Sequence, residues 1–234
     1  MAPDAPDLKP RHQFYGRRVG HALRPAQARL MTEFLPTVAF AADDPRLADP
    51  QTLFDRGVHS VRLEIGFGGG ERLAALAEAN PDMGFLGIEP FVNGVAKLVS
   101  AIEAKGLRNV RLHHGDARDV LAAIGAGTLD EVALLYPDPW PKKRHQRRRF
   151  VQPETLAEMH RMLKPGGAFF FASDIPDYVA WTLQRVLSHG GFAWTARRPA
   201  DWKDPPPDWV RTRYEAKAVR ESRTPCYLRF ERRT

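Results

Sequence analysis

Short apolar segments alternate along most of the chain with stretches that carry apolar residues on one helical face. The apolar segments predict strands at residues 61–65, 84–89, 109–114, 130–136 and 168–173. Helices are predicted over 70–80, through Val95 to Gly106, around 117–125, from Pro153 to the stop at 164–167 and over 178–191, and two final strands at 192–197 and 226–232. This order predicts right-handed β-α-β units in one parallel sheet with helices on both faces.

Composition sets the size of the core and the kind of partner. The chain has 234 residues, of which 43% are hydrophobic, and this is enough for one sizeable core. Its 35 lysines and arginines exceed its 28 aspartates and glutamates, and the resulting net charge of +7 suggests an anionic partner. Residues 1–50 are rich in Pro, Asp and Ala with a basic cluster at 11–25, so we expect a partly flexible, basic N-terminal extension before a main domain at 51–234.

The sequence argues against a secreted or membrane-bound protein. Cys226 is the only cysteine, which excludes an internal disulfide and favours a reducing compartment. No apolar run approaches the ~18 residues of a transmembrane helix, and the first residues lack the apolar region of a secretory signal. We therefore expect a cytoplasmic protein without a membrane partner. His113 and His114 are adjacent on a predicted strand and point to opposite faces, so we expect no metal site.

Ligands bind to sheets of this kind at the carboxyl ends of the strands. The first strand ends in "EIGFGGG" (64–70), whose glycines allow a tight turn and a close approach of a ligand to the backbone. Glu71 stands where the dinucleotide fingerprint G-x-G-x-x-G needs its last glycine. Glu64 would repel a pyrophosphate, whereas it would attract the ammonium and sulfonium groups of S-adenosylmethionine.

The next two strands also end in acids. Glu89 follows the second strand and can accept hydrogen bonds from both ribose hydroxyls of an adenosine. Asp116 follows the third strand and can accept from an exocyclic adenine amine. Acids at three consecutive strand ends are a more specific signal for such a cofactor than any one of them alone.

The fourth strand ends in "PDPW" (137–140) and a block of positive charge. The two prolines fix the backbone on both sides of Asp138, so its carboxylate is held rigidly at the mouth of the cleft. Trp140 can either stack on a base or cap the core. Six cations follow within eight residues: Lys142, Lys143, Arg144, Arg147, Arg148 and Arg149. Because this basic block adjoins the predicted site, we interpret it as a contact for a phosphate backbone, the alternative being a solvated face.

These segments resemble, in order, those of the bacterial tRNA (guanine-N7)-methyltransferases. The resemblance rests on "RLEIGFGGGE", "LGIEPFVNGVAKL", "GDARDVL", "YPDPWPKKRHQRRRFVQPETLAEMHRMLKPGG", "SDIPDY" and "TRYEAKAVRESRTPCYLRFER". Pairing of P-D-P-W-x-K with a downstream T-x-[FY]-E is highly specific to that family. Ser222 is a departure, because the family has glycine at this position, which puts only the local turn in doubt.

The resemblance implies a fold and a reaction. The fold is that of class I methyltransferases, a Rossmann-like, doubly wound α/β sheet of seven mostly parallel strands whose last strand is antiparallel. The reaction transfers a methyl group from S-adenosylmethionine to N7 of guanine 46 in the variable loop of tRNA. The sequence favours neither a monomer nor a homodimer.

The resemblance also implies roles for single residues. The cofactor-binding positions are Glu64, Gly66, Gly68, Glu89, Asp116 and Asp138, of which Asp138 is also catalytic. The substrate-binding positions are Lys142, Asp174, Thr212, Arg213, Tyr214 and Glu215. The RNA-binding positions are Arg144, His145, Gln146, Arg147, Arg148 and Arg149.

The chemistry of guanine N7 suggests what a fixed carboxylate can do. N7 has a free lone pair and no proton, so its methylation needs no general base beforehand. Asp138 can orient the base and stabilise the positive charge that develops on the purine, although a general-base role stays open. Two other functions stay open. A methyltransferase for an exocyclic amine would have D/N-P-P-Y/F at the fourth strand, and a non-catalytic RNA-binding protein would not need all the strand-end acids.

Overall fold

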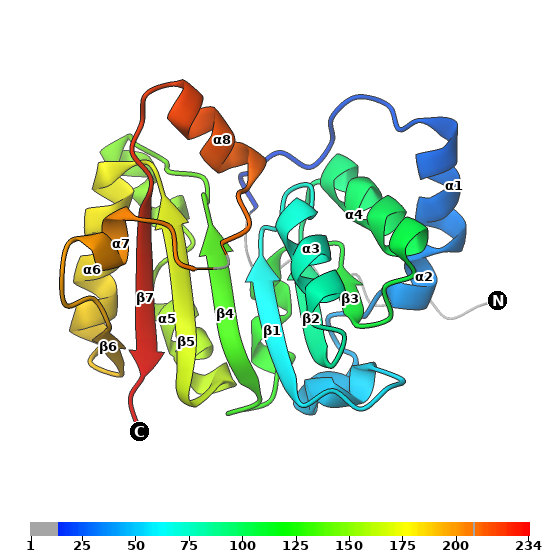
Figure 1. Cartoon of the computed structure of the whole chain (residues 1–234), viewed down its shortest axis with the longest axis horizontal. Coiled ribbons are helices and arrows are strands. Elements are labelled where there is room, and N and C mark those ends of the chain that lie inside the picture. Colours follow the sequence, from blue (N-terminus) through cyan, green and yellow to red (C-terminus); the bar gives the residue numbers. More distant parts are fainter. Residues whose placement is uncertain (1–13, 208) are drawn as a thin grey trace.

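A seven-stranded sheet forms the centre of the molecule. The computed structural model describes residues 14–207 and 209–234. Its strands are β1 (Ser60–Ile65), β2 (Met83–Ile88), β3 (Val110–His113), β4 (Leu129–Leu135), β5 (Leu163–Ser173), β6 (Phe192–Trp194) and β7 (Cys226–Arg232). Their order is β3-β2-β1-β4-β5-β7-β6, and β7 runs antiparallel to both of its neighbours. This confirms the predicted fold class, including the antiparallel last strand (Figure 1).

Helices cover both faces of the sheet. The longer ones are α3 (Glu71–Ala79), α4 (Val92–Lys105), α5 (Pro153–Met162) and α6 (Pro176–His189). Shorter ones are α1 (Pro25–Glu33), α2 (Leu35–Val38), α7 (Ala200–Lys203) and α8 (Arg213–Arg220). In Figure 1, α3 and α4 lie on the near face, α5 lies on the far face, and α8 lies above the strand ends. None of the helices within 14–207 and 209–234 is long and apolar enough to cross a bilayer.

The alternation of side chains along the strands builds two apolar layers. Val132 and Leu134 of β4 join Phe169 and Phe171 of β5 in the larger core, toward α5 and α6. Ala133, Leu135, Phe170, Ala172 and Tyr227 point the other way and form a smaller cluster. A third cluster lies between α3, α4 and the first strands. Burial on both faces explains why the parallel strands are almost continuously apolar.

One predicted helix is wrong. Residues 117–125 form two short 3₁₀ turns, at Ala117–Asp119 and Leu121–Ala123, and no α-helix. Asp116 caps only the first turn, where it accepts a hydrogen bond from the Arg118 backbone N–H. Gly125 then packs directly on the chain, because a Cβ there would lie 2.0 Å from the Ala48 carbonyl oxygen. The close approach of these backbones leaves no room for a further helical turn.

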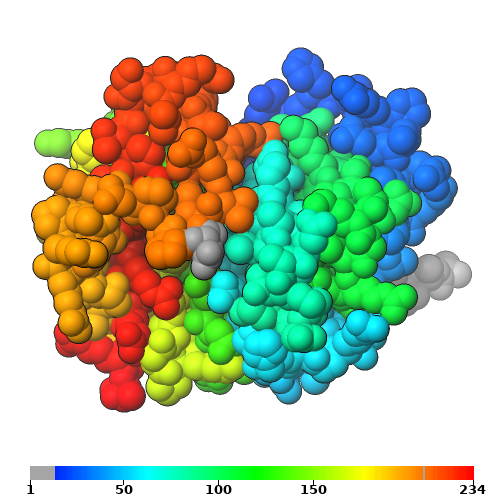
Figure 2. All heavy atoms as spheres, in the orientation of Figure 1, coloured from blue at the N-terminus to red at the C-terminus, as the bar shows by residue number. Residues whose placement is uncertain are grey.

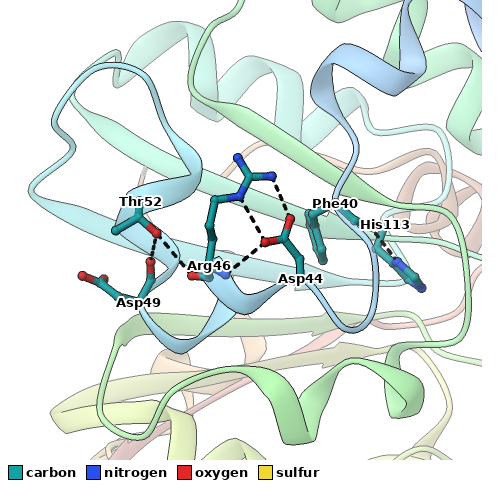
Figure 3. Close-up of polar contacts among 6 residues, drawn as sticks. All are labelled: Phe40, Asp44, Arg46, Asp49, Thr52 and His113. Atoms are coloured by element: carbon teal, nitrogen blue, oxygen red, sulfur yellow. Dashed lines mark hydrogen bonds and ion pairs between the residues drawn. The ribbon is translucent and has the colours of Figure 1, made fainter.

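Much of the predicted N-terminal extension packs on the core. Leu30, Val38, Phe40 and Leu47 are all buried. Figure 3 shows polar contacts in the segment from Phe40 to Thr52. The Asp44 carboxylate accepts from the Arg46 guanidinium. The His113 ring donates to the Phe40 carbonyl oxygen over 3.1 Å. Residues 1–13, which include the start of the predicted basic cluster, lie outside the described residues.

The glycine turn after β1 (residues 66–70) packs against α4. Because of this contact, we expect a Gly→Ala exchange in α4 to destabilise the protein. Gly→Ala inside a helix normally stabilises by about 1 kcal/mol. A Cβ at Gly94, however, would lie 2.0 Å from the Gly68 backbone oxygen. We expect Gly94→Ala to lower the free energy of unfolding by about 1–3 kcal/mol, measured by urea denaturation.

Gly57→Ala is the control for this variant. Nothing lies within 4 Å of a Cβ at Gly57, so its stability should stay within about 0.5 kcal/mol of the wild type. A stabilised Gly94→Ala protein would show that α4 and the glycine turn are not in close contact.

Candidate active site

A cavity of about 310 Å³ opens at the carboxyl ends of the first four strands. Its floor is apolar and is formed by Ile65, Ile88, Ala117, Leu134 and Leu135. The rim is formed by the N-terminal segment 14–17 on one side and by Tyr214 of α8 on the other. Figure 2 shows a notch at the top of the molecule between α8 in orange-red and the N-terminal segment in blue. A cavity of this size fits a nucleoside-sized ligand.

Three predicted cofactor residues lie at the end of β1 and in the glycine turn that follows it, and only one of them lines the cavity. Gly66 lines the cavity with a φ of 71°, and a Cβ at this position would meet nothing within 4 Å. Gly68 lies behind it, under the Tyr214 ring. The Glu64 side chain is outside the cavity lining and is buried in an ion pair with Arg72 at 2.7 Å. Burial raises the pKa of Glu64, and Arg72 opposes that change. A direct cofactor contact by Glu64 therefore stays a prediction.

Glu89 reaches the cavity from the end of β2. Its carboxylate accepts hydrogen bonds from the Gly68 N–H at 2.7 Å and the Phe91 N–H at 2.9 Å. These bonds tie the glycine turn to the start of α4. Burial raises the pKa of Glu89, while the two backbone N–H groups oppose the shift. Its remaining lone pairs are available to a donor in the cavity.

Asp116 lines the same cavity after β3. It accepts from the Arg118 backbone N–H at 3.0 Å and from the Arg118 guanidinium at 3.0 and 2.6 Å. The bidentate geometry fixes the orientation of the carboxylate. Asp116 and Glu89 thus stand at neighbouring strand ends above the apolar floor, as the strand pattern predicts.

The corner after β4 brings Asp138 into the cavity. Among the described residues, none donates a hydrogen bond to its carboxylate or forms an ion pair with it. Asp138 is exposed at the cavity mouth, and partial desolvation of its carboxylate by the surrounding walls raises its pKa above the ordinary value. The backbone on either side is strained, because Tyr136 has a φ of 49° and Trp140 a φ of 42°. A carboxylate without a partner, held by a strained corner, is typical of a functional position.

The basic block divides into exposed and enclosed cations. Lys142, Lys143, Arg144 and Arg147 are exposed. Arg148 lies over the rings of Tyr15 and Trp140, with its guanidinium carbon 4.0 and 5.0 Å from their centroids. Arg149 is only 1% exposed and forms an ion pair with Asp177. This burial does not favour the predicted RNA contact by Arg149, which stays a prediction. Trp140 serves as a wall of the cavity.

The other predicted substrate residues lie at different depths. Lys142 is exposed, whereas Asp174 forms an ion pair with Arg223. Thr212 caps α8 by accepting from the Glu215 N–H at 3.1 Å. Arg213 faces Glu71, and their nitrogen and oxygen atoms lie 3.7 Å apart. Ser222, where the family has glycine, has a φ of 57°, the left-handed conformation that glycine adopts without strain.

Two residues of α8 differ sharply in exposure. Tyr214 lines the cavity and is 45% exposed. Glu215 is 1% exposed and accepts from Trp209 Nε1 at 2.5 Å and from the Tyr227 hydroxyl at 2.9 Å. Glu215 therefore anchors α8 to the sheet in this structure, while Tyr214 faces the ligand space.

The sequence offered no strand-end signal for the N-terminal wall of the cavity. Phe14 to Arg17 line it, and the Tyr15 ring contacts Trp140 edge-on with centroids 6.2 Å apart. The residues that follow it are bonded to α4: the Val92 N–H donates to the Arg18 carbonyl at 2.9 Å, and the Asn93 side chain bonds the backbone of Gly20 and His21. The adjacent aromatic residues Phe14 and Tyr15 within a basic stretch are the sequence feature that could have indicated this wall.

Solved structures with a similar fold include two rRNA methyltransferases. The 16S rRNA methyltransferase KamB aligns with 76% of this chain and 89% of its own length, with a TM-score of 0.55 and 16% identity. The 16S rRNA (adenine(1408)-N(1))-methyltransferase from Catenulisporales acidiphilia aligns with 83% of this chain and 94% of its own, with a TM-score of 0.53 and 18% identity. At these identities the likeness concerns the fold alone.

The sequence comparisons are much closer. The family model described as "Putative methyltransferase" matches residues 59–227. The tRNA (guanine-N(7)-)-methyltransferase of Nitrobacter hamburgensis is 52% identical over 94% of this chain and 86% of its own length. The enzyme of the same name from Rhizobium meliloti is 51% identical over 94% of both chains. The chain therefore belongs to the tRNA (guanine-N7)-methyltransferase family, as its motifs predict.

Proposed function

We propose that this protein transfers a methyl group from S-adenosylmethionine to N7 of a guanine in tRNA, and that the guanine is residue 46 of the variable loop. The observation that carries the proposal is the Asp138 carboxylate, which has no hydrogen-bond or ion-pair partner among residues 14–207 and 209–234, shares one cavity with Glu89 and Asp116 and adjoins four exposed cations. The two relatives described above are named as methyltransferases of guanine N7 in tRNA, and this supports the same reaction. With tRNA as its partner, the enzyme would work in the cytoplasm.

The cavity fits S-adenosylmethionine. Apolar Ile65, Ile88 and Leu134 suit a purine ring, and the open backbone at Gly66 lets a ligand approach closely. Glu89 would hold the ribose hydroxyls and Asp116 the adenine amine, since both carboxylates keep free lone pairs. When bound, S-adenosylmethionine supplies an electrophilic methyl group on a sulfonium.

Asp138 orients the guanine and stabilises charge. Guanine N7 presents a lone pair without a proton, so no residue has to remove one before methylation. Methylation leaves the purine positively charged, and a fixed carboxylate stabilises this charge in proportion to its closeness and its desolvation. The Asp138 carboxylate makes no competing bond within the described chain and can accept from a guanine N–H donor. Electrostatic stabilisation, rather than general-base catalysis, is the role we assign to it.

The exposed cations of the basic block are the proposed phosphate contacts. Lys142, Lys143, Arg144 and Arg147 follow directly on the Asp138 corner and point to solvent. A backbone held on this side would place a flipped base at the cavity mouth, where Tyr214 and Trp140 offer aromatic surfaces.

Two alternatives predict different outcomes. A methyltransferase for another RNA base would label a position other than guanine N7. A non-catalytic RNA-binding protein would leave tRNA unlabelled. Incubation with labelled S-adenosylmethionine and unmodified tRNA, followed by mapping of the modified base, distinguishes all three.

The strand-end acids should control cofactor affinity. Glu89→Gln and Asp116→Asn each remove a charged acceptor, and loss of such a bond costs about 1.5–3 kcal/mol, or roughly ten- to a hundredfold in affinity for S-adenosylmethionine. Isothermal titration calorimetry measures this change. Asp119→Asn, in the same 3₁₀ turn but exposed, is the matched control and should bind like the wild type. Wild-type affinity in both test variants would exclude this cavity as the cofactor site.

Asp138→Asn should separate chemistry from binding. The substitution keeps the shape but removes the charge, so the single-turnover rate should fall about 10²-fold while tRNA affinity is kept. Because the pKa of Asp138 is raised, the wild-type rate should increase with pH as the carboxylate forms, at a higher pH than for an ordinary aspartate. The rate of the Asn variant should not show this dependence on pH. A variant with normal turnover and weakened tRNA binding would contradict the assignment.

The exposed cations should act through counterion release. Arg144→Ala combined with Arg147→Ala should weaken binding of all tRNAs about equally. The slope of log affinity against log salt should flatten by about 0.7–0.9 for each phosphate that is no longer neutralised. Arg56→Ala is the control, since this exposed arginine precedes the amino end of β1, at the opposite edge of the sheet. An unchanged salt slope in the double variant would mean that the basic block is an ordinary solvated surface.

A further inference from the structure

Arg149, the last cation of the basic block, is enclosed by the protein. Its side chain has no exposed surface and forms an ion pair with Asp177 in the first turn of α6. The guanidinium carbon lies 4.9 Å from the Tyr178 ring centroid and 4.8 Å from that of Trp181. One N–H is directed elsewhere, because Nε donates to the Pro139 carbonyl oxygen over 2.8 Å.

That carbonyl belongs to the residue directly after Asp138. The corner it forms is strained on both sides, at Tyr136 and at Trp140, and such backbone persists only where surrounding contacts hold it. The Arg149–Pro139 hydrogen bond connects the corner to α6 and to the main core.

The segment after Arg149 is fixed to the same helix. The Tyr178 hydroxyl accepts from the Phe150 N–H at 3.0 Å, and Trp181 Nε1 donates to the Val151 carbonyl at 2.8 Å. These bonds fix the backbone next to Arg149, and this restricts where its guanidinium can lie relative to the corner.

We propose that Arg149 is a positioning residue: it holds the corner of residues 137–140, and through it the Asp138 carboxylate, and makes no contact with RNA. The inference rests on the proposed function, because it assigns a role in that reaction. A planar guanidinium is suited to this task, since its separate N–H groups can bind Asp177 and the Pro139 carbonyl at the same time.

Arg149→Lys is the test. Lysine keeps the charge but offers a single ammonium, which cannot maintain both bonds in this geometry. We expect kcat to fall about 10²-fold, the effect of a misplacement of roughly 1 Å at a reacting centre. The KM for tRNA and the salt slope of tRNA binding should stay at wild-type values. Arg56→Lys, the same exchange at an exposed site away from the cavity, should alter none of these quantities.

Arg147→Ala provides the contrast within the basic block. This exposed neighbour should raise the KM for tRNA and flatten the salt slope, which Arg149→Lys should not do. Wild-type kcat in a folded Arg149→Lys protein would overturn the proposal. A flattened salt slope in that variant would also overturn it, because it would show that Arg149 contacts phosphate.

A second readout is independent of turnover. In protein labelled with 5-fluorotryptophan, the ¹⁹F resonance of Trp140, assigned with Trp140→Phe, should shift in Arg149→Lys and remain in place in Arg56→Lys. If the wild type did not methylate guanine N7, the proposed function would fail, yet this resonance would still report whether Arg149 positions the corner. An unmoved resonance would refute the positioning role.

Asp177→Asn covers the case in which Arg149→Lys does not fold. Asp177 is 61% exposed in its side chain, so we expect the substitution to leave the fold intact while it weakens one of the two bonds of Arg149. We expect a reduced kcat, an unchanged KM for tRNA and a shifted Trp140 resonance. Wild-type values of kcat and of the resonance would contradict the proposal.

Discussion

The parallel register of four strands is the constraint on which the site depends. Ile65 of β1 pairs with Ile88 of β2 and with Leu134 of β4, and Ile88 pairs in turn with His113 of β3. The four strands consequently end at one level, and the loops that follow them begin side by side. Glu64 and Asp138, 74 positions apart in the chain, are brought to one edge of the sheet by the parallel pairing of β1 with β4.

The electrostatics of the edge follow from this arrangement. Burial raises the pKa values of Glu64, beneath the cavity, and of Glu89, in its lining. Partial desolvation at the cavity mouth raises the pKa of Asp138 as well. The first two are compensated by Arg72 and by backbone N–H groups, respectively. Only Asp138 depends on what enters the cavity. In the proposed reaction, a developing purine cation would be a suitable partner for this carboxylate, and the adjoining exposed cations would attract the phosphates of the tRNA.

Residues that are close together in the sequence differ sharply in exposure. Arg147 and Arg149 are two positions apart, yet one points to solvent and the other is packed between two aromatic rings. Tyr214 and Glu215 are adjacent, and again one faces the cavity while the other is buried. A stretch predicted to bind substrate therefore contains both residues that face solvent or the cavity and residues that are buried in the protein.

The sequence alone indicated the approximate positions of the strands and the acids that follow them, because short apolar segments and glycine or proline breaks are local properties. It missed that β5 begins at Leu163 and includes the predicted helix stop. The motif pair of P-D-P-W-x-K and T-x-[FY]-E was sufficient for the family. Only the tertiary structure decided that residues 117–125 are 3₁₀ turns, since Gly125 packs on the Ala48 backbone, which is distant in sequence. It also decided that Glu64 pairs with Arg72 and that Arg149 is buried against α6. The residue type gives the charge of a side chain. Its partner and its exposure depend on segments that come into contact only when the chain folds.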